Sequence, residues 1–157
     1  MDSNDSDYTV AMYADALEAW ITALESGEYP QTTGMMCRLD ASYQPVGYCC
    51  LGVFCEVAMA HGASITRIVM ENEDEDDPQI DPHYLYNNNG GTYLPAEVGS
   101  WSGLCPLNGE TLSVLAVDLG GMCAAQHNDD GKTFAQIVEL LRKHVKPVPR
   151  PAARIAD

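Results

Sequence analysis

The sequence predicts a compact single α+β domain, mostly helical, with a buried central helix and one or two small β-hairpins. The first observation is an apolar run at residues 48–62 that carries a single charge, Glu56. The second is a pair of amphipathic stripes with helical spacing, one near each end of the chain. The third is a middle region of short apolar segments separated by Gly, Pro, Asn and Asp, which is typical of strands and turns.

The apolar run predicts the central helix. It is shorter than the roughly 20 residues that a membrane span needs. Leu51, Cys55 and Met59 recur every four residues, and Gly62 stands where a glycine ends many helices. We therefore expect a helix over residues 49–61 that is covered on most of its circumference.

Two further helices are predicted by the terminal stripes. Residues 9–26 place four large apolar side chains on one face: Tyr13, Leu17, Trp20 and Leu24. Residues 134–145 do the same with Phe134, Ile137, Val138 and Leu141, and Thr133 can cap this helix. We expect residues 1–146 to form one globular domain and residues 147–157 to form a flexible, basic, Pro-rich tail.

The middle of the chain predicts shorter elements. Residues 35–39 and 46–48 suit a hairpin that leads into the central helix, and residues 65–70 suit a strand. Residues 84–86 and 92–94 suit a second hairpin, because Asn and Gly between them allow a tight turn. We also expect a helical turn over residues 95–101, a helix over residues 110–119 and a turn over residues 128–131.

The charge is strongly acidic and unevenly distributed. The net charge is −15, yet residues 1–131 contain only two basic side chains, Arg38 and Arg67. This balance disfavours direct binding to nucleic acid and favours encounter with a partner that has a basic surface. The first residues are acidic and polar, unlike a secretory leader, and no stretch suits a membrane span, so we expect a cytoplasmic protein with reduced cysteines.

A dense acidic segment follows residue 70 and comprises Glu71, Glu73, Asp74, Glu75, Asp76 and Asp77. Such a run repels itself, which is typical of a solvated loop. Three interpretations remain open: a plain solvated loop, a recognition loop for a basic protein surface, or a calcium-binding loop. The glycine and final glutamate of an EF-hand loop are absent.

Four blocks of sequence carry a resemblance to a known family. In order they are W-x3-L-x2-G-x-Y from Trp20, YCCLGVxC from Tyr48, LP-x2-V-x2-W from Leu94, and ND-x-G-x-[ST]-F-x2-I from Asn128. Together they resemble a family of small uncharacterised bacteriophage and prophage proteins. Phe54 stands where leucine is commoner in that family, and the acidic segment is an insertion. The resemblance implies a phage-type accessory protein and no particular reaction.

Candidate catalytic and metal-binding residues are few. Cys49 at a helix N-terminus would have a lowered pKa, with His61, His83 or His127 as a possible base. Asp118, Asp129 and Asp130 could pair for acid–base work, although residues 128–131 also suit a turn. Cys50 and Cys55 form a C-x4-C pair, at the wide end of the spacing of zinc sites, and the adjacent Cys49 and Cys50 point to different sides of a helix. We therefore expect no metal and no cofactor.

The sequence leaves three functional hypotheses. The first is a non-enzymatic accessory protein that binds a host protein, inhibiting a defence or nucleic-acid enzyme through its acidic surface. The second is a protein that binds or sequesters a small ligand such as a signalling nucleotide, with a site built from Tyr84, Tyr86, Tyr93, Arg38 and Arg67. The third is an enzyme that uses Cys49 or the Asp129 region. The oligomeric state is not predicted.

Overall fold

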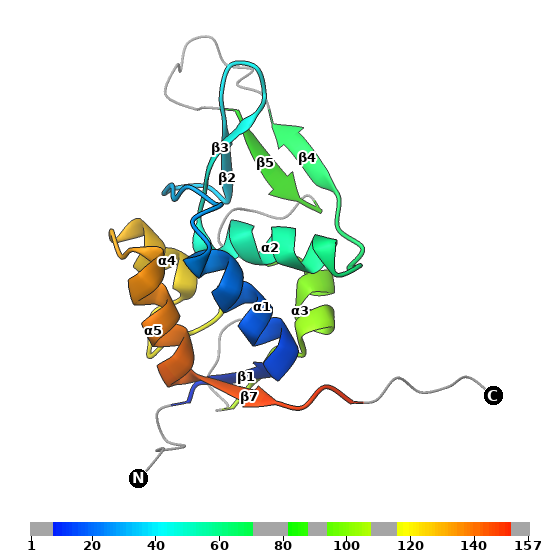
Figure 1. The fold of residues 1–157 in the computed structure, drawn as a ribbon, viewed down its shortest axis with the longest axis vertical. Coiled ribbons are helices and arrows are strands. Elements are labelled where there is room, and N and C mark those ends of the chain that lie inside the picture. The colour runs from blue at the N-terminus through cyan, green and yellow to red at the C-terminus, as the bar shows by residue number, and fades with distance from the viewer. Residues whose placement is uncertain (1–7, 71–81, 88–93, 108–115, 152–157) are drawn as a thin grey trace, which may run out of the picture.

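A computed structural model describes residues 8–70, 82–87, 94–107 and 116–151 (Figure 1). Its helices are α1 (Ala14–Glu25), α2 (Cys50–Ala60), α3 (Ala96–Ser102), α4 (Ala124–Asp129) and α5 (Phe134–His144). Its strands are β1 (Val10–Tyr13), β2 (Cys37–Leu39), β3 (Pro45–Tyr48), β4 (Arg67–Met70), β5 (His83–Tyr86), β6 (Cys105–Pro106) and β7 (Val145–Val148). The α+β class is confirmed, and the strands form two sheets, which is more sheet than the one or two hairpins predicted.

The predicted central helix is confirmed as α2, with Cys49 as its N-cap and His61 as its C-cap. It lies between α1, α3 and α4, and its residues from Cys50 to Ala58 are buried. Aromatic stacking joins α1 to α2 in the core, where the Trp20 and Phe54 rings are parallel and 4.0 Å apart between centroids. The Trp20 indole also donates to the Cys50 carbonyl at 3.0 Å, which satisfies its buried N–H.

One sheet joins the two ends of the described chain. β1 lies between β6, to which it is antiparallel, and β7, to which it is parallel. The prediction that the first helix starts at residue 9 is therefore wrong, because Val10 pairs with Val145 and α1 begins only at Ala14. β7 extends past residue 146, where the sequence predicts the domain to end, and its Val148 pairs with Tyr13 of β1.

The second sheet has the order β3-β2-β5-β4 and is antiparallel throughout. The hairpin of β2 and β3 leads into α2, as predicted. The predicted partner of residues 84–86 in a second hairpin was residues 92–94, whereas the structure places β5 between β2 and β4. Residues 92–93 lie outside the described residues, and Leu94 is buried but in no strand.

The C-terminal third differs from the sequence prediction in two places. Residues 110–115 of the predicted helix lie outside the described residues, and residues 117–119 are not α-helical, since Val117 has a φ of 56°. The predicted turn at residues 128–131 is wrong in its first half, because Asn128 and Asp129 end α4. The last helix is confirmed, with a capping box between Thr133 and Gln136.

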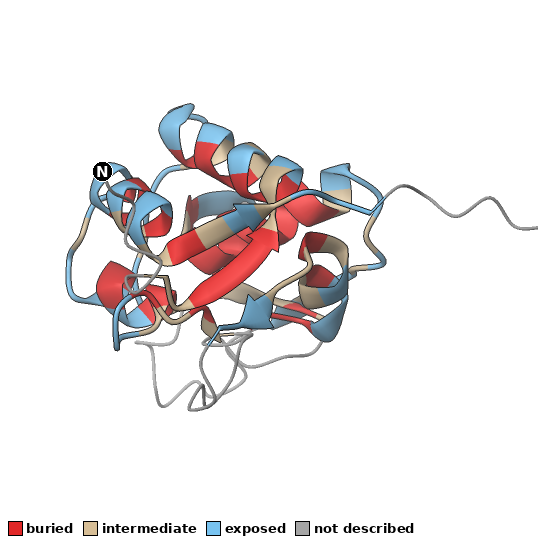
Figure 2. Cartoon of the chain, turned by 90° about the horizontal axis from the view of Figure 1, so that it is seen from below, coloured by how far each residue is buried: buried red, intermediate tan, exposed pale blue. Residues whose placement is uncertain are grey.

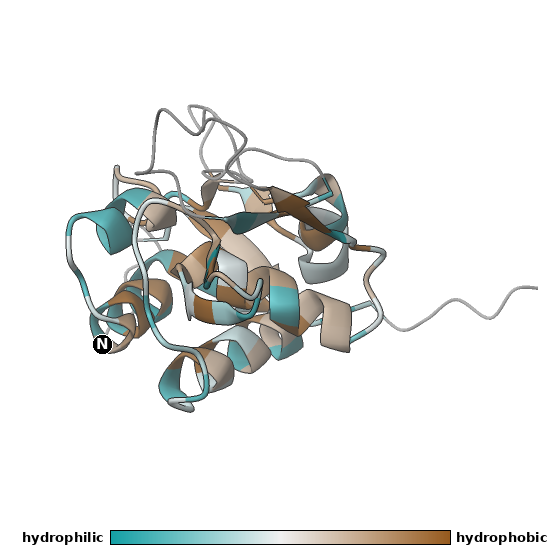
Figure 3. Ribbon diagram, turned by 90° about the horizontal axis from the view of Figure 1, so that it is seen from above, coloured by the Kyte–Doolittle hydropathy of each residue, from teal (hydrophilic) through white to brown (hydrophobic). Residues whose placement is uncertain are grey.

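The surface follows the amphipathic pattern of the helices. Seen from the β1–β7 end, the helices turn buried residues inward and exposed residues outward (Figure 2). Seen from the opposite end, hydrophilic and hydrophobic residues alternate along the helices (Figure 3). Within the described residues, no helix combines the length and the hydropathy needed to cross a membrane.

Candidate functional site

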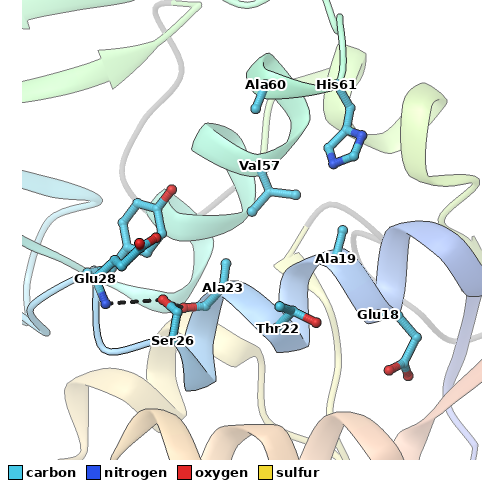
Figure 4. A pocket seen from close by; sticks show the side chains of 10 residues that line it. Glu18, Ala19, Thr22, Ala23, Ser26, Glu28, Val57, Ala60 and His61 are labelled. Atoms are coloured by element: carbon cyan, nitrogen blue, oxygen red, sulfur yellow. Dashed lines mark hydrogen bonds between the residues drawn. The ribbon is translucent and has the colours of Figure 1, made fainter.

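A groove of about 400 Å³ lies on the surface between α1 and the C-terminal half of α2 (Figure 4). Its floor is made of small apolar side chains, Ala19 and Ala23 from α1 and Val57 and Ala60 from α2. Ala19 and Ala23 are four residues apart, so they stand one above the other on the same helical face. Larger side chains at these positions would fill the space between the two helices.

The charged groups of the groove are acidic. Glu18 lies at one end and Glu28 at the other, and no lysine or arginine is among the described residues that line it. Glu18 also faces Arg142 of α5 at 3.5 Å, but both side chains are more than half exposed, so this pair is weak. Burial raises the pKa of Tyr29, which lines the groove beside Glu28, and the charges of Glu56 and Glu28 raise it further.

The rim of the groove is held by local contacts. The backbone N–H of Glu28 donates to the Ser26 hydroxyl at 3.1 Å, which fixes the chain just after α1 (Figure 4). The His61 ring, at the end of α2, stacks on Trp101 of α3 at 5.5 Å between centroids. The arrangement offers an apolar trough with an acidic residue at each end, of which Glu18 turns its carboxylate toward α5 (Figure 4). Such a trough suits the aliphatic stem of a lysine or arginine.

A second polar cluster lies between α2 and the four-stranded sheet. Glu56 is only 8% exposed and accepts from Arg67 through both carboxylate oxygens and from the Tyr86 hydroxyl at 2.7 Å. The hydrogen bond to Glu56 raises the pKa of Arg67, and burial, followed by the Glu56 charge, raises the pKa of Tyr86. Glu56 therefore fixes the sheet to the central helix.

The residues predicted for a small ligand are only partly brought together. Arg67 lies over the Tyr84 ring at 5.8 Å, and Tyr84 and Tyr86 are 6.2 Å apart. Arg38 of β2 lies opposite His83 of β5, which is the neighbour of Tyr84 in the chain. Because neighbouring residues of a strand point to opposite faces, Arg38 and Tyr84 lie on opposite faces of the sheet. Its guanidinium donates to the Thr32 hydroxyl at 3.0 Å and to the Thr33 carbonyl at 3.3 Å. Tyr93 lies outside the described residues.

The candidate nucleophile is not activated. The Cys49 side chain accepts from the Gly52 N–H as the cap of α2, but burial raises its pKa to about 11 rather than lowering it. The expectation of a lowered pKa at this helix N-terminus is therefore wrong, since loss of water outweighs the helix N–H groups. Of the proposed bases, His127 bonds the Leu119 carbonyl at 3.1 Å, His61 stacks on Trp101, and His83 lies in β5.

The candidate aspartates each support a turn or a helix end. Asp129 accepts from the Gly34 N–H at 2.9 Å, and Asp118 accepts from the Gly121 N–H at 2.7 Å. Asp130 accepts from the Gln126 side chain at 3.0 Å, one helical turn away. Across the described residues, no three His, Cys, Asp or Glu side chains are grouped so that they could hold a metal ion.

The predicted partner-binding segment, residues 71–77, lies outside the described residues. The strands on either side of it are described, and Met70 of β4 pairs with His83 of β5. The groove was not predicted from the sequence. Its signal was the small residues Ala19 and Ala23 beside the buried stripe of α1, but the stripe alone does not reveal which helix packs next to them.

These observations define a small α+β protein with a surface groove that has an apolar floor and an acidic residue at each end. Residues 12–145 match the family described as domain of unknown function (DUF8296), and the chain belongs to this family. No curated protein and no solved structure matches the chain.

Proposed function

We propose that this protein is a non-enzymatic, phage-type accessory protein that acts in the host cytoplasm by binding a host protein with a basic surface. A defence or nucleic-acid enzyme fits such a partner, because its phosphate-binding groove is basic. The observation that carries the proposal is the groove between α1 and α2, which has acidic ends in an acidic body.

The few arginines of this acidic body are engaged in internal contacts. Arg38 and Arg67 are the only basic side chains in residues 1–131, and both donate to groups of the protein itself. Arg67 is matched by Glu56, so its charge is largely cancelled at short range. A basic partner thus meets little opposing charge over this part of the chain, which raises the association rate and favours correct partners.

The other two hypotheses find less support. Phosphate groups of a nucleotide would be repelled by Glu18 and Glu28, and Arg67 and the Tyr86 hydroxyl are already bound to Glu56. An enzyme based on Cys49 lacks a thiolate at neutral pH, because the thiol is buried. In place of a catalytic pair, the Asp129 carboxylate accepts from the Gly34 N–H, which is a structural role.

The test is affinity capture from a nuclease-treated bacterial host lysate on the immobilised protein, with elution by a salt gradient. Retained proteins are identified by mass spectrometry, and the purified partner is then titrated by calorimetry at low and high salt. We expect one host protein that elutes at modest salt, with an affinity that falls as salt rises.

Two sets of variants separate the possible contact surfaces. Glu18→Gln with Glu28→Gln removes the groove charges, and Glu73→Gln, Asp74→Asn, Glu75→Gln and Asp76→Asn removes those of the acidic segment. Glu139→Gln with Glu97→Gln is the control for loss of two exposed charges elsewhere. We expect the groove variant to bind at least tenfold more weakly than the control. Equal binding by all three variants, or no retained protein, would contradict the proposal.

A further inference from the structure

Arg150, just beyond β7, folds back onto the protein and is held by three side chains. Its guanidinium carbon lies 4.5 Å from the centre of the Tyr13 ring and 5.6 Å from that of Trp101. Its Nε donates to Asp15 at 2.8 Å. We call Tyr13, Asp15 and Trp101 the arginine cage. Two aromatic faces and one carboxylate are the groups that recognise a guanidinium.

The cage is positioned by contacts that do not involve Arg150. Trp101 is fixed by the stacked His61 ring and by Phe54 at 6.1 Å between centroids. Tyr13 is the last residue of β1, and its ring lies against Gly103, where an added Cβ would come within 2.7 Å of it. Asp15 follows in the first turn of α1. The cage is therefore formed whether or not an arginine occupies it.

Arg150 itself is held weakly. It lies between Pro149 and Pro151, which have no backbone N–H, and two residues beyond Val148, the last residue of β7. Its side chain is 33% exposed and that of Asp15 is 62% exposed, so water and salt screen their ion pair. Release of Arg150 leaves β7 paired to β1 and exposes the cage.

The cage continues the groove. Asp15 and Glu18 are three residues apart on α1, so they are neighbours on the helix surface. His61 lines the groove and stacks on Trp101 of the cage. An extended or helical segment that crosses the groove thus reaches the cage at the N-terminal end of α1.

We propose that the arginine cage recognises an arginine side chain of the partner protein, and that Arg150 occupies it as a tethered competitor until the partner arrives. The inference rests on the proposed function, because the basic surface of the partner supplies the arginine. Arginine fits better than lysine, since a planar guanidinium stacks on Tyr13 and Trp101 while its N–H groups reach Asp15. A second copy of this chain fits poorly, since two chains of net charge −15 repel each other.

The test uses a synthetic peptide in place of the partner. The probe is acetyl-Val-Pro-Arg-Pro-Ala-amide, with versions that carry Lys or Ala instead of Arg, followed by NMR through the Trp101 indole signal. A short flexible tether gives Arg150 an effective concentration of about 1 mM. We expect Arg150→Ala to bind the Arg peptide at least tenfold more tightly than wild type, the Lys peptide more weakly and the Ala peptide not at all.

Two variants control for charge and for the carboxylate. Arg154→Ala removes a second arginine of the same tail, at a position outside the described residues, and we expect it to bind like wild type. Asp15→Asn added to Arg150→Ala should lose most of the gain. Equal binding of the Arg and Ala peptides, or equal binding by Arg150→Ala and Arg154→Ala, would overturn the inference.

This experiment can fail independently of the proposed function, because it needs no partner. Peptide binding without any retained host protein would refute the proposed function and leave the cage as an arginine site. A retained host protein that binds Arg150→Ala, Asp15→Asn and wild type equally would refute the cage and leave the proposed function standing.

Discussion

Glu56 is the charged side chain on which the contact between α2 and the four-stranded sheet depends. It is buried, and both Arg67 and Tyr86 donate to it. Glu56→Gln removes the negative charge that faces the Arg67 guanidinium and the Tyr86 hydroxyl, and an amide has only one oxygen to accept from these two donors. We expect a loss of about 3 kcal/mol in the free energy of unfolding, measured by urea denaturation. Glu139→Gln, on the exposed face of α5, should change it by less than about 0.5 kcal/mol. Equal losses would mean that the Glu56 network contributes little.

Cys49 tests whether the cysteines can act as nucleophiles. Because burial raises its pKa to about 11, the thiolate is scarce at pH 7.5 and the sulfur is closed to reagents. We expect iodoacetamide to label the exposed Cys105 at least 100-fold faster than Cys49 in the folded protein, followed by mass spectrometry of peptides. In urea the two rates should converge. Rapid labelling of Cys49 in the folded state would revive the enzyme hypothesis.

Single residues also show where sequence reasoning reaches its limit. Thr133 as a cap and Trp20 in the core follow from local spacing, so both could be predicted. The partners of Glu56 could not, because Arg67 and Tyr86 meet it only through the pairing of β4 with β5. The arginine cage could not be predicted from the sequence either, because the pairing of β1 with β7 is what brings Arg150 close to Asp15.

At the scale of elements, Gly52 sets how closely α2 approaches the loop before β2. A Cβ at this position would lie 2.0 Å from the Met36 carbonyl oxygen, which belongs to the backbone. Gly→Ala normally stabilises a helix by about 1 kcal/mol. We expect Gly52→Ala to lower the free energy of unfolding instead, by about 2 kcal/mol or more, in the same urea measurement. A gain in stability would show that the loop yields easily.

The elements that sequence patterns predicted best are those with many residues on one face. The apolar run of α2 and the stripe of α5 determined both helices within a residue or two. β1 was missed because Tyr13 fits a helical stripe as well as a strand, and only its pairing with β7 decides between them. α4 was missed because it is short and ends in residues that favour turns, Asn128 and Asp129.

At the scale of the whole molecule, β7 links the end of the described chain to its beginning. Val145 is fully buried, and the Thr9 N–H donates to the His144 carbonyl at 2.8 Å, so this strand belongs to the core. Truncation after Val148 removes Arg150 but no residue of β7, and we expect the melting temperature to change by no more than a few degrees.

Truncation after His144 should be far more damaging. It leaves the edge of β1 unpaired and removes the buried Val145, so we expect a loss of several kcal/mol or failure to fold. Circular dichroism during heating compares the two truncations with the full chain. Similar melting temperatures for both would show that β7 is dispensable and would restore the boundary that the sequence indicated. If only the truncation after His144 lowers the melting temperature strongly, β7 belongs to the folding unit, and the folded domain extends at least to Val148.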